Sequence, residues 1–223
     1  NVYEAIFDQE IIDKRLDELV TSKHYYHLHN IDNGIFFASV EYFKKINTEW
    51  CNLPITTLMI SSPGEVYAGK TLDYTTDALP VNVNWFDHKK QVFLAESSQF
   101  YLELRLLMKN VDKVFSIYNS FRKEKADYSH LAEFQHIEFE GKVSSKENVD
   151  IAYKLLDYIT NYLLKNNKND LSYFLSTKDM NDLKGIFNQD KIEIMSFKKA
   201  LKLLYTETKD ERYKEFTLKN FGG

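Results

Sequence analysis

The chain has 223 residues, of which 43% are hydrophobic and 15% aromatic, so its composition excludes an intrinsically disordered protein and suits one domain with a large core. Its net charge of −4 excludes a protein that attracts nucleic acid over its whole surface, although a local contact stays open. A single cysteine, Cys51, excludes an intramolecular disulfide framework, and no signal peptide or membrane-spanning run is visible, which predicts a cytoplasmic protein with no membrane contact.

Helical patterns dominate the first part of the chain. Apolar residues recur near helical spacing over residues 4–20 and again over 36–46, which predicts two helices. All three prolines fall within 54–80, and this predicts loops and short strands there. A third helix is predicted over 97–109, where Phe100, Leu104 and Leu107 form one stripe.

Two strands then form a predicted hairpin. Residues 114–122 and 134–143 alternate in the manner of strands, so alternate side chains share a face. One face of the second strand carries Phe134, His136, Glu138 and Glu140. On the first strand, Arg122 and Glu124 are expected on the face of Tyr118 and Ser120.

Helices are predicted for the rest of the chain. Ser144 and Glu147 form a capping box that opens a long helix, and residues 166–170 end it in a turn. A final helix is marked by apolar residues over 197–204. Because strands and helices do not alternate regularly, we expect an α+β fold, with an antiparallel sheet flanked by helices.

The loop of the hairpin carries side chains that suit a nucleotide. The guanidinium of Arg122 can grip a phosphate through two parallel hydrogen bonds, and His130 could contact a terminal phosphate. Phe134 lies on the polar face, where it could stack on adenine, and Glu124 could accept a hydrogen bond from a base amino group or a nucleophile. Taken singly, each of these is more simply an ordinary solvated hairpin residue, whereas the whole string, with Leu131-Ala132-Glu133-Phe134 directly after His130, favours the functional interpretation.

The third helix carries a second candidate site. Gln99 and Glu103 are four residues apart, so both side chains project from one helical face. A carboxamide and a carboxylate together suit a zwitterion, because one can hold the ammonium group and the other a side-chain donor. The alternative is a solvated polar face.

These segments resemble the class II aminoacyl-tRNA synthetases, and are most similar to the asparaginyl and aspartyl group. The part that resembles motif two is Phe121-Arg122-Lys123-Glu124, then Leu131-Ala132-Glu133-Phe134, then Ile137-Glu138-Phe139-Glu140. The resemblance implies that Arg122 binds the α-phosphate of ATP, that His130 lies near the γ-phosphate and that Phe134 stacks on adenine. It also implies that Glu124 lies near adenine or the tRNA end, and that ATP and Mg²⁺ are the cofactors.

The segment from Ser98 to Glu103 resembles the amino-acid-binding segment of the same family. The resemblance implies that Gln99 binds the substrate's α-amino group, with Glu65 as a second ammonium contact. Aspartyl enzymes carry a lysine and a glutamine near the end of this segment, whereas Leu102 and Glu103 stand here, as in asparaginyl enzymes. An acidic residue suits an amide donor and repels a carboxylate, so asparagine is favoured over aspartate.

The resemblance also implies a domain plan and a homodimer. The helix over 36–46 and the segment that ends at Pro54 resemble motif one, which builds the dimer interface in this class. We expect one class II synthetase-like catalytic domain over 1–223, without an anticodon-binding domain. Its parts are a helical lead-in over 1–30, a core over 31–143 and a helical insertion over 144–223.

Two departures from the family pattern leave the function open. Ser129 stands where the family has an arginine before the histidine, and no segment resembling motif three follows, so the core is expected to be incomplete at its C-terminus. Three explanations remain: a further downstream half, a paralogue that works without tRNA (as a related asparagine synthetase does), or a non-catalytic relative. We expect ATP-dependent activation of asparagine or aspartate through an aminoacyl adenylate, with tRNA, ammonia or another amine as the acceptor. The alternative is a ligand-binding or regulatory module.

Overall fold

The computed structural model of the chain describes residues 9–53, 79–81, 92–95, 97–121, 131–187 and 193–213. The chain divides into two compact units, Asn1–Gly185 and Ile186–Gly223. The described helices of the first unit are α1 (Gln9–Thr21), α2 (Lys23–Lys45), α4 (Gln99–Leu106), α5 (Ser145–Asn166), α6 (Lys168–Phe174) and α7 (Thr177–Leu183). Its strands are β1 (Glu49–Trp50), β2 (Leu79–Val81), β3 (Val92–Leu94), β4 (Lys113–Phe121) and β5 (Glu133–Gly141).

The predicted hairpin is confirmed as β4 and β5, which pair antiparallel from Lys113 opposite Gly141 to Phe121 opposite Glu133. The predicted antiparallel sheet is confirmed only in part, because β1 lies on the other side of β4 and runs parallel to it. The described sheet is therefore mixed, in the order β1-β4-β5, and β2 and β3 form a separate antiparallel pair. Strand β1 has two residues, too few to show an alternating pattern.

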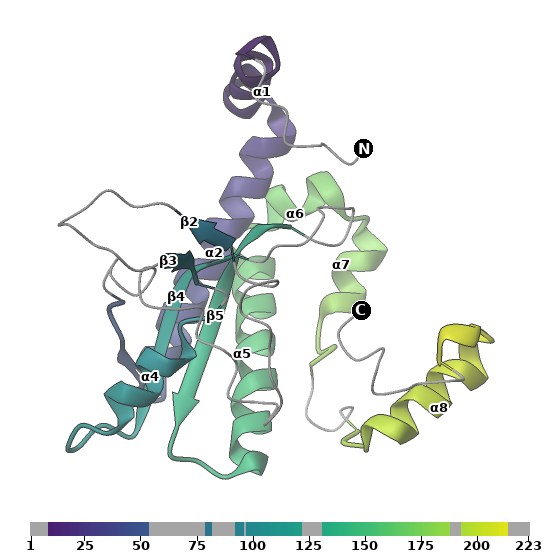
Figure 1. The fold of residues 1–223 in the computed structure, drawn as a ribbon. Coiled ribbons are helices and arrows are strands. Elements are labelled where there is room, and N and C mark those ends of the chain that lie inside the picture. The colour runs from purple at the N-terminus through teal and green to yellow at the C-terminus, as the bar shows by residue number, and fades with distance from the viewer. Residues whose placement is uncertain are drawn as a thin grey trace, which may run out of the picture. The chain divides into compact units, whose positions relative to one another are not determined.

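Strand alternation gives the hairpin one apolar and one polar face. Phe115 on β4 is buried and packs with Phe43 of α2, their ring centroids 4.5 Å apart. Ile137 and Phe139 of β5 join this cluster, to which α5 adds Leu155. Helices α2 and α5 thus cover the apolar face, while α4 packs against the same two strands (Figure 1). Because α4 contacts residues of the opposite parity, it lies on the other face.

The predicted helices are confirmed in their main parts, but the two short helices α6 and α7 were not predicted. The capping box at α5 is confirmed: the Ser144 hydroxyl accepts from the Glu147 N–H at 3.3 Å, and the Glu147 carboxylate accepts from the Ser144 N–H at 2.8 Å. Helix α2 begins at Lys23, well before the predicted start. The turn predicted over 166–170 is wrong beyond Asn167, because α6 begins at Lys168. Helices α6 and α7 have seven residues each, two turns at most, and so carry little periodic signal.

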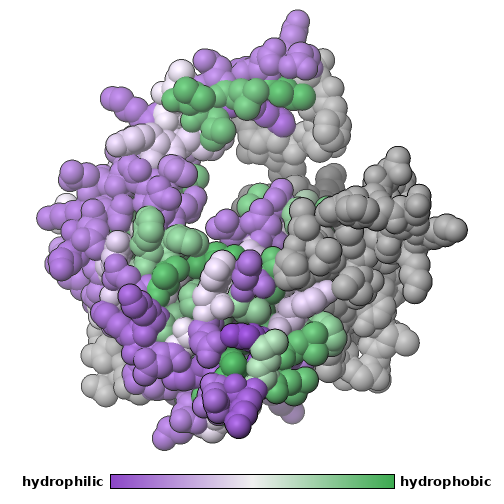
Figure 2. Space-filling view, turned by 90° about the vertical axis from the view of Figure 1, so that its left-hand side faces the viewer, coloured by the Kyte–Doolittle hydropathy of each residue, from purple (hydrophilic) through white to green (hydrophobic). Residues whose placement is uncertain are grey.

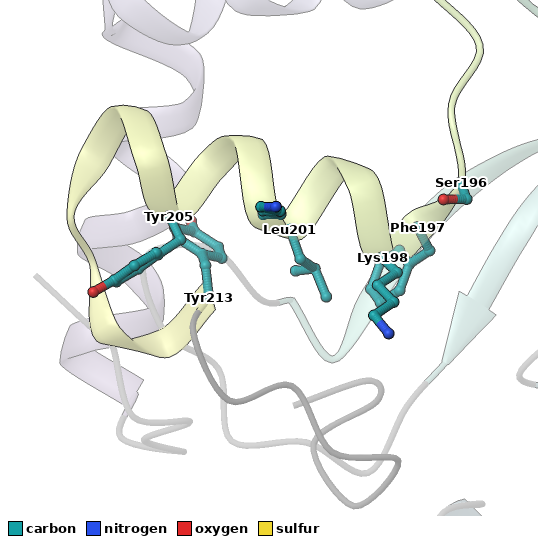
Figure 3. A pocket seen from close by; sticks show the side chains of 7 residues that line it. Ser196, Phe197, Lys198, Leu201, Tyr205 and Tyr213 are labelled. Carbon is teal, nitrogen blue, oxygen red and sulfur yellow. The ribbon is translucent and has the colours of Figure 1, made fainter.

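The second unit contains α8 (Phe197–Thr208) and the 3₁₀ helix η3 (Glu211–Tyr213), so the predicted final helix is confirmed. Its N-cap is Ser196, whose hydroxyl accepts from the Lys199 N–H at 3.3 Å. Along α8, Phe197, Leu201 and Tyr205 follow one another beside an open pocket of about 770 Å³, and Tyr213 lines its end (Figure 3). Within the part of the chain that the structure describes, none of the helices combines the length and apolar content needed to span a membrane.

Candidate functional site

Three of the seven predicted site residues belong to the described part of the chain: Gln99, Glu103 and Phe134. The other four lie outside the described residues, and they are Glu65, Arg122, Glu124 and His130. The phosphate-binding roles of Arg122 and His130 therefore stay predictions. The three described residues lie on α4 and on the polar face of β5.

The first turn of α4 is fixed to the sheet by two serines that precede it. The hydroxyl of Ser97 accepts from the Gln99 N–H at 3.1 Å, and the Ser98 N–H donates to the Tyr118 hydroxyl of β4 at 2.8 Å. On its inner side, Leu102 is fully buried and packs in one cluster with Val114 of β4. These contacts place Gln99 at the edge of the polar face of the sheet.

The side chains of Gln99 and Glu103 meet each other and a third group from β5. The amide nitrogen of Gln99 donates to Glu103 Oε1 at 3.3 Å, one helical turn away, in agreement with their spacing. The Gln99 side chain also hydrogen-bonds the carboxylate of Glu140. Because its amide nitrogen faces these two carboxylates, its carbonyl oxygen is the atom that suits an ammonium donor.

Glu140 lies close to two further carboxylates, those of Glu138 and Glu103, and this proximity changes the charge of the site. Burial, followed by the negative charges of Glu138 and Glu103, raises the pKa of Glu140 to about 7, while the hydrogen bond from Gln99 acts in the opposite direction. Near neutral pH, Glu140 is therefore partly protonated when no ligand is bound. A cation bound here would be attracted by the carboxylates and would favour release of that proton.

The third carboxylate, Glu138, is held by two hydroxyl groups. Tyr118 donates to its Oε2 atom, and Ser97 donates to its Oε1 atom at 3.4 Å. Burial and then the hydrogen bond to Glu138 raise the pKa of Tyr118, so the phenol stays protonated as a donor. Sequence reasoning did not single out Tyr118 or Ser97, although the alternation of β4 already put Tyr118 on the polar face.

The candidate adenine contact, Phe134, lies further along the same face of β5. Its half-buried ring packs edge-on against His136, with centroids 4.9 Å apart, and Ser120 holds His136 through a 2.8 Å contact to Nδ1. Glu138 follows Phe134 by four positions in an extended strand, which corresponds to about 13 Å. An aromatic ring and an acidic cluster therefore occupy the two ends of one strand face.

Comparison with known proteins gives one family and a set of related folds. The model of the family described as tRNA synthetases class II (D, K and N) matches residues 70–220. An asparagine–tRNA ligase of Protochlamydia amoebophila (strain UWE25) is 27% identical over an alignment of 203 residues, which covers 82% of this chain and 41% of the relative.

Solved structures share the fold of the chain at low sequence identity. The asparaginyl-tRNA synthetase of Pyrococcus horikoshii, complexed with asparaginyl-adenylate, has a TM-score of 0.69 and 20% identity, covering 90% of this chain and 42% of its own. The corresponding complex from Entamoeba histolytica has a TM-score of 0.66 and 16% identity, with 97% and 43% covered. The chain thus spans less than half the length of each of these relatives.

Proposed function

Because the chain belongs to the class II tRNA synthetase family of the D, K and N type, a family of ligases, we propose that it activates an amino acid with ATP. The observation that carries this proposal is the gathering of Gln99, Glu103 and Glu140 on the strand face that also bears Phe134. In the reaction, a carboxylate oxygen of the amino acid attacks the α-phosphorus of ATP. The new oxygen–phosphorus bond makes an aminoacyl adenylate, and the bond to pyrophosphate breaks.

Asparagine is the proposed substrate, with aspartate as its closest competitor. The proposed amino-acid site is acidic, with Glu103, Glu138 and Glu140 close enough for the first two to raise the pKa of the third. An ammonium group and a side-chain amide NH₂ both donate hydrogen bonds to such a site, whereas a second carboxylate would be repelled. Gln99 would accept from the ammonium group, and Glu65 would be a further contact.

ATP would bind along the hairpin. We assign Phe134 to adenine stacking, Arg122 to the α-phosphate, His130 to the γ-phosphate and Glu124 to the base or the tRNA end. The half-buried ring of Phe134, held edge-on by His136, supports the first of these roles. A guanidinium beside the α-phosphate would stabilise the charge that develops during attack.

Magnesium has no group of ligands among the described residues. Over the residues that the structure describes, no cluster of three or more histidine, cysteine or acidic residues is able to hold a metal ion. We therefore propose Mg²⁺ only as the ion that accompanies ATP in this family, and no step above depends on it.

A homodimer is the proposed assembly. Phe36 and Phe37 on α2 and Trp50 on β1 are all about half exposed or more, and they belong to the segments that resemble motif one. Leu107, at the end of α4, is 81% exposed, and apolar side chains also gather on the side of the molecule shown in Figure 2. A second copy of the chain would cover such residues.

One observation favours a different function. Ser129 stands where the family has an arginine, so the loop has one cation fewer for a triphosphate. This favours a ligand-binding or regulatory module that keeps the pocket without the chemistry. Calorimetric titration of the full-length protein with asparagine and with aspartate tests the pocket in both cases. Amino-acid-dependent exchange of labelled pyrophosphate into ATP separates an enzyme, which gives exchange, from a module, which binds asparagine without it.

A further inference from the structure

We propose that Tyr118 is a positioning residue whose hydroxyl sets where α4 holds Gln99 and Glu103 relative to the carboxylates of β5, and so sets the affinity for the amino acid. The inference rests on the proposed function for its ligand, because Gln99 and Glu103 are the proposed amino-acid contacts. The geometry that supports it is independent of that ligand.

The hydroxyl of Tyr118 lies where α4 and β5 approach each other. It accepts from the Ser98 N–H at 2.8 Å and donates to the Glu138 carboxylate. The hydroxyl of Ser97 lies 3.4 Å from the Tyr118 hydroxyl oxygen. It donates to Oε1 of Glu138, whereas Tyr118 donates to Oε2. One phenol therefore connects the backbone that precedes α4 to an acidic side chain of β5.

Water cannot easily replace this connection, because the residues on the helix side are buried. Ser97 is 7% exposed and Ser98 is 3% exposed. Without the phenol oxygen, the Ser98 N–H would be a buried donor with no acceptor, which is costly. The hydrogen bond from the Ser98 N–H therefore stabilises the Tyr118 hydroxyl in this position.

The ring of Tyr118 also contacts a residue of β5. It packs edge-on against His136, with centroids 5.8 Å apart and an angle of 83° between the rings. His136 is in turn held by Ser120, which is fully buried. Because both its ring and its hydroxyl are held, Tyr118 has little freedom to move. It can therefore fix the distance between the start of α4 and β5.

That distance matters because the proposed amino-acid site begins one residue later. Gln99 directly follows Ser98, and Glu103 comes one helical turn after Gln99. When the Ser98 N–H is held, the amide of Gln99 reaches both Glu103 and Glu140. When it is released, the first turn of α4 can shift away from β5, and the ammonium site widens.

The test is Tyr118→Phe in the full-length protein, which keeps the ring and removes the hydroxyl. In asparagine-dependent pyrophosphate exchange, we expect the KM for asparagine to rise about tenfold, while kcat and the KM for ATP stay within about twofold. Hydrogen exchange at the Ser98 amide should become faster by a similar factor. A variant that keeps both the wild-type KM for asparagine and the protection of Ser98 would overturn the proposal.

A matched control removes a buried phenol elsewhere. Tyr42 is 6% exposed, and its hydroxyl donates to the Ile151 carbonyl at 3.1 Å, between α2 and α5. Tyr42→Phe should lower the melting temperature but leave the KM for asparagine and the Ser98 exchange rate unchanged. A rise of the KM in both variants would point to general destabilisation and would contradict a specific role of Tyr118.

The outcomes keep the two proposals apart. If the wild type neither binds nor activates asparagine, the proposed function fails, yet Ser98 exchange in Tyr118→Phe still decides the positioning role. If Tyr118→Phe does not fold, the wild type decides it: the Ser98 amide must exchange as slowly as that of buried Leu102. Rapid exchange of Ser98 in the wild type would overturn the proposal.

Discussion

Gln99 of α4 and Glu140 of β5 are 41 positions apart in the chain, and the amide of the first hydrogen-bonds the carboxylate of the second. The same amide also donates to Glu103, so a single side chain bridges two acids. This contact defines the candidate site more closely than any motif, because it brings a helix and a strand together. The first two predictions test its charge.

The first prediction concerns the pH dependence of stability. The pKa of Glu140 is about 7 in the folded chain, against 4.5 for the unperturbed group. Between these values the folded state keeps a proton that the unfolded chain has released, so this group makes the free energy of unfolding fall as pH rises from about 4.5 to 7. Glu140→Gln should remove that fall, and urea unfolding at pH 5, 6, 7 and 8 measures it.

The control for this experiment is Glu133→Gln on the same strand. Glu133 is exposed and accepts from Asn119 at 2.8 Å, away from the acidic cluster. It should retain the pH dependence of the wild type. An identical slope in Glu140→Gln and in the wild type would show that Glu140 is not the group that holds the proton.

The second prediction concerns the choice between asparagine and aspartate. Glu103→Gln removes one negative charge from the pocket, which weakens the acceptor for an amide NH₂ and lowers the repulsion of a carboxylate. We expect the preference for asparagine, as the ratio of kcat/KM values in pyrophosphate exchange, to fall about tenfold.

Glu49→Gln is the matched control for that charge. Glu49 pairs with Arg105 at 2.9 Å on the surface, so its loss changes the net charge equally without touching the pocket. Its preference should equal that of the wild type. If Glu103→Gln also keeps the wild-type preference, Glu103 does not face the substrate side chain.

The third prediction concerns the packing of α2 on α5, which covers the apolar face of the hairpin. A Cβ at Gly34 would lie 2.5 Å from Leu163 Cδ2 and 2.6 Å from Asn167 Oδ1. Gly34→Ala should therefore destabilise the fold by about 1–3 kcal/mol, although alanine favours a helix, because overpacking outweighs propensity. Thermal unfolding measures the change.

Asn33→Ala separates these two effects. Asn33 is exposed on the same helix, so alanine gains propensity there without a clash and should be neutral or slightly stabilising. A Gly34→Ala protein as stable as Asn33→Ala would mean that α2 and α5 do not approach each other so closely.

Local patterns predicted much of the fold. The alternation of residues 134–140 already puts Phe134 and Glu138 on one face, and the capping box at Ser144 marks the first turn of α5. Strand β1 was not predicted, because two residues are too few to show an alternating pattern. Its parallel pairing with β4 depends on the rest of the fold. The spacing of residues reports only on positions close in sequence, so it could not predict pairings between distant segments of this kind.

The sequence likewise predicted one part of the candidate site and not the other. Spacing predicted that Gln99 and Glu103 share a face, because both lie on one helix. It could not predict that Glu140 and Tyr118 complete the cluster, since those contacts arise when α4 packs on the hairpin. The burial that raises the pKa of Glu140 is likewise a property of the packed state and of no local motif.

The most direct test of the central claim is exchange of labelled pyrophosphate into ATP by the full-length protein. We predict exchange that depends on asparagine, is weaker with aspartate, and falls at least about 100-fold in Arg122→Ala but not in Arg15→Ala, which removes an arginine of α1 outside the site. Exchange that survives Arg122→Ala would remove that residue from the reaction. No exchange with asparagine, aspartate or close analogues would contradict amino-acid activation itself.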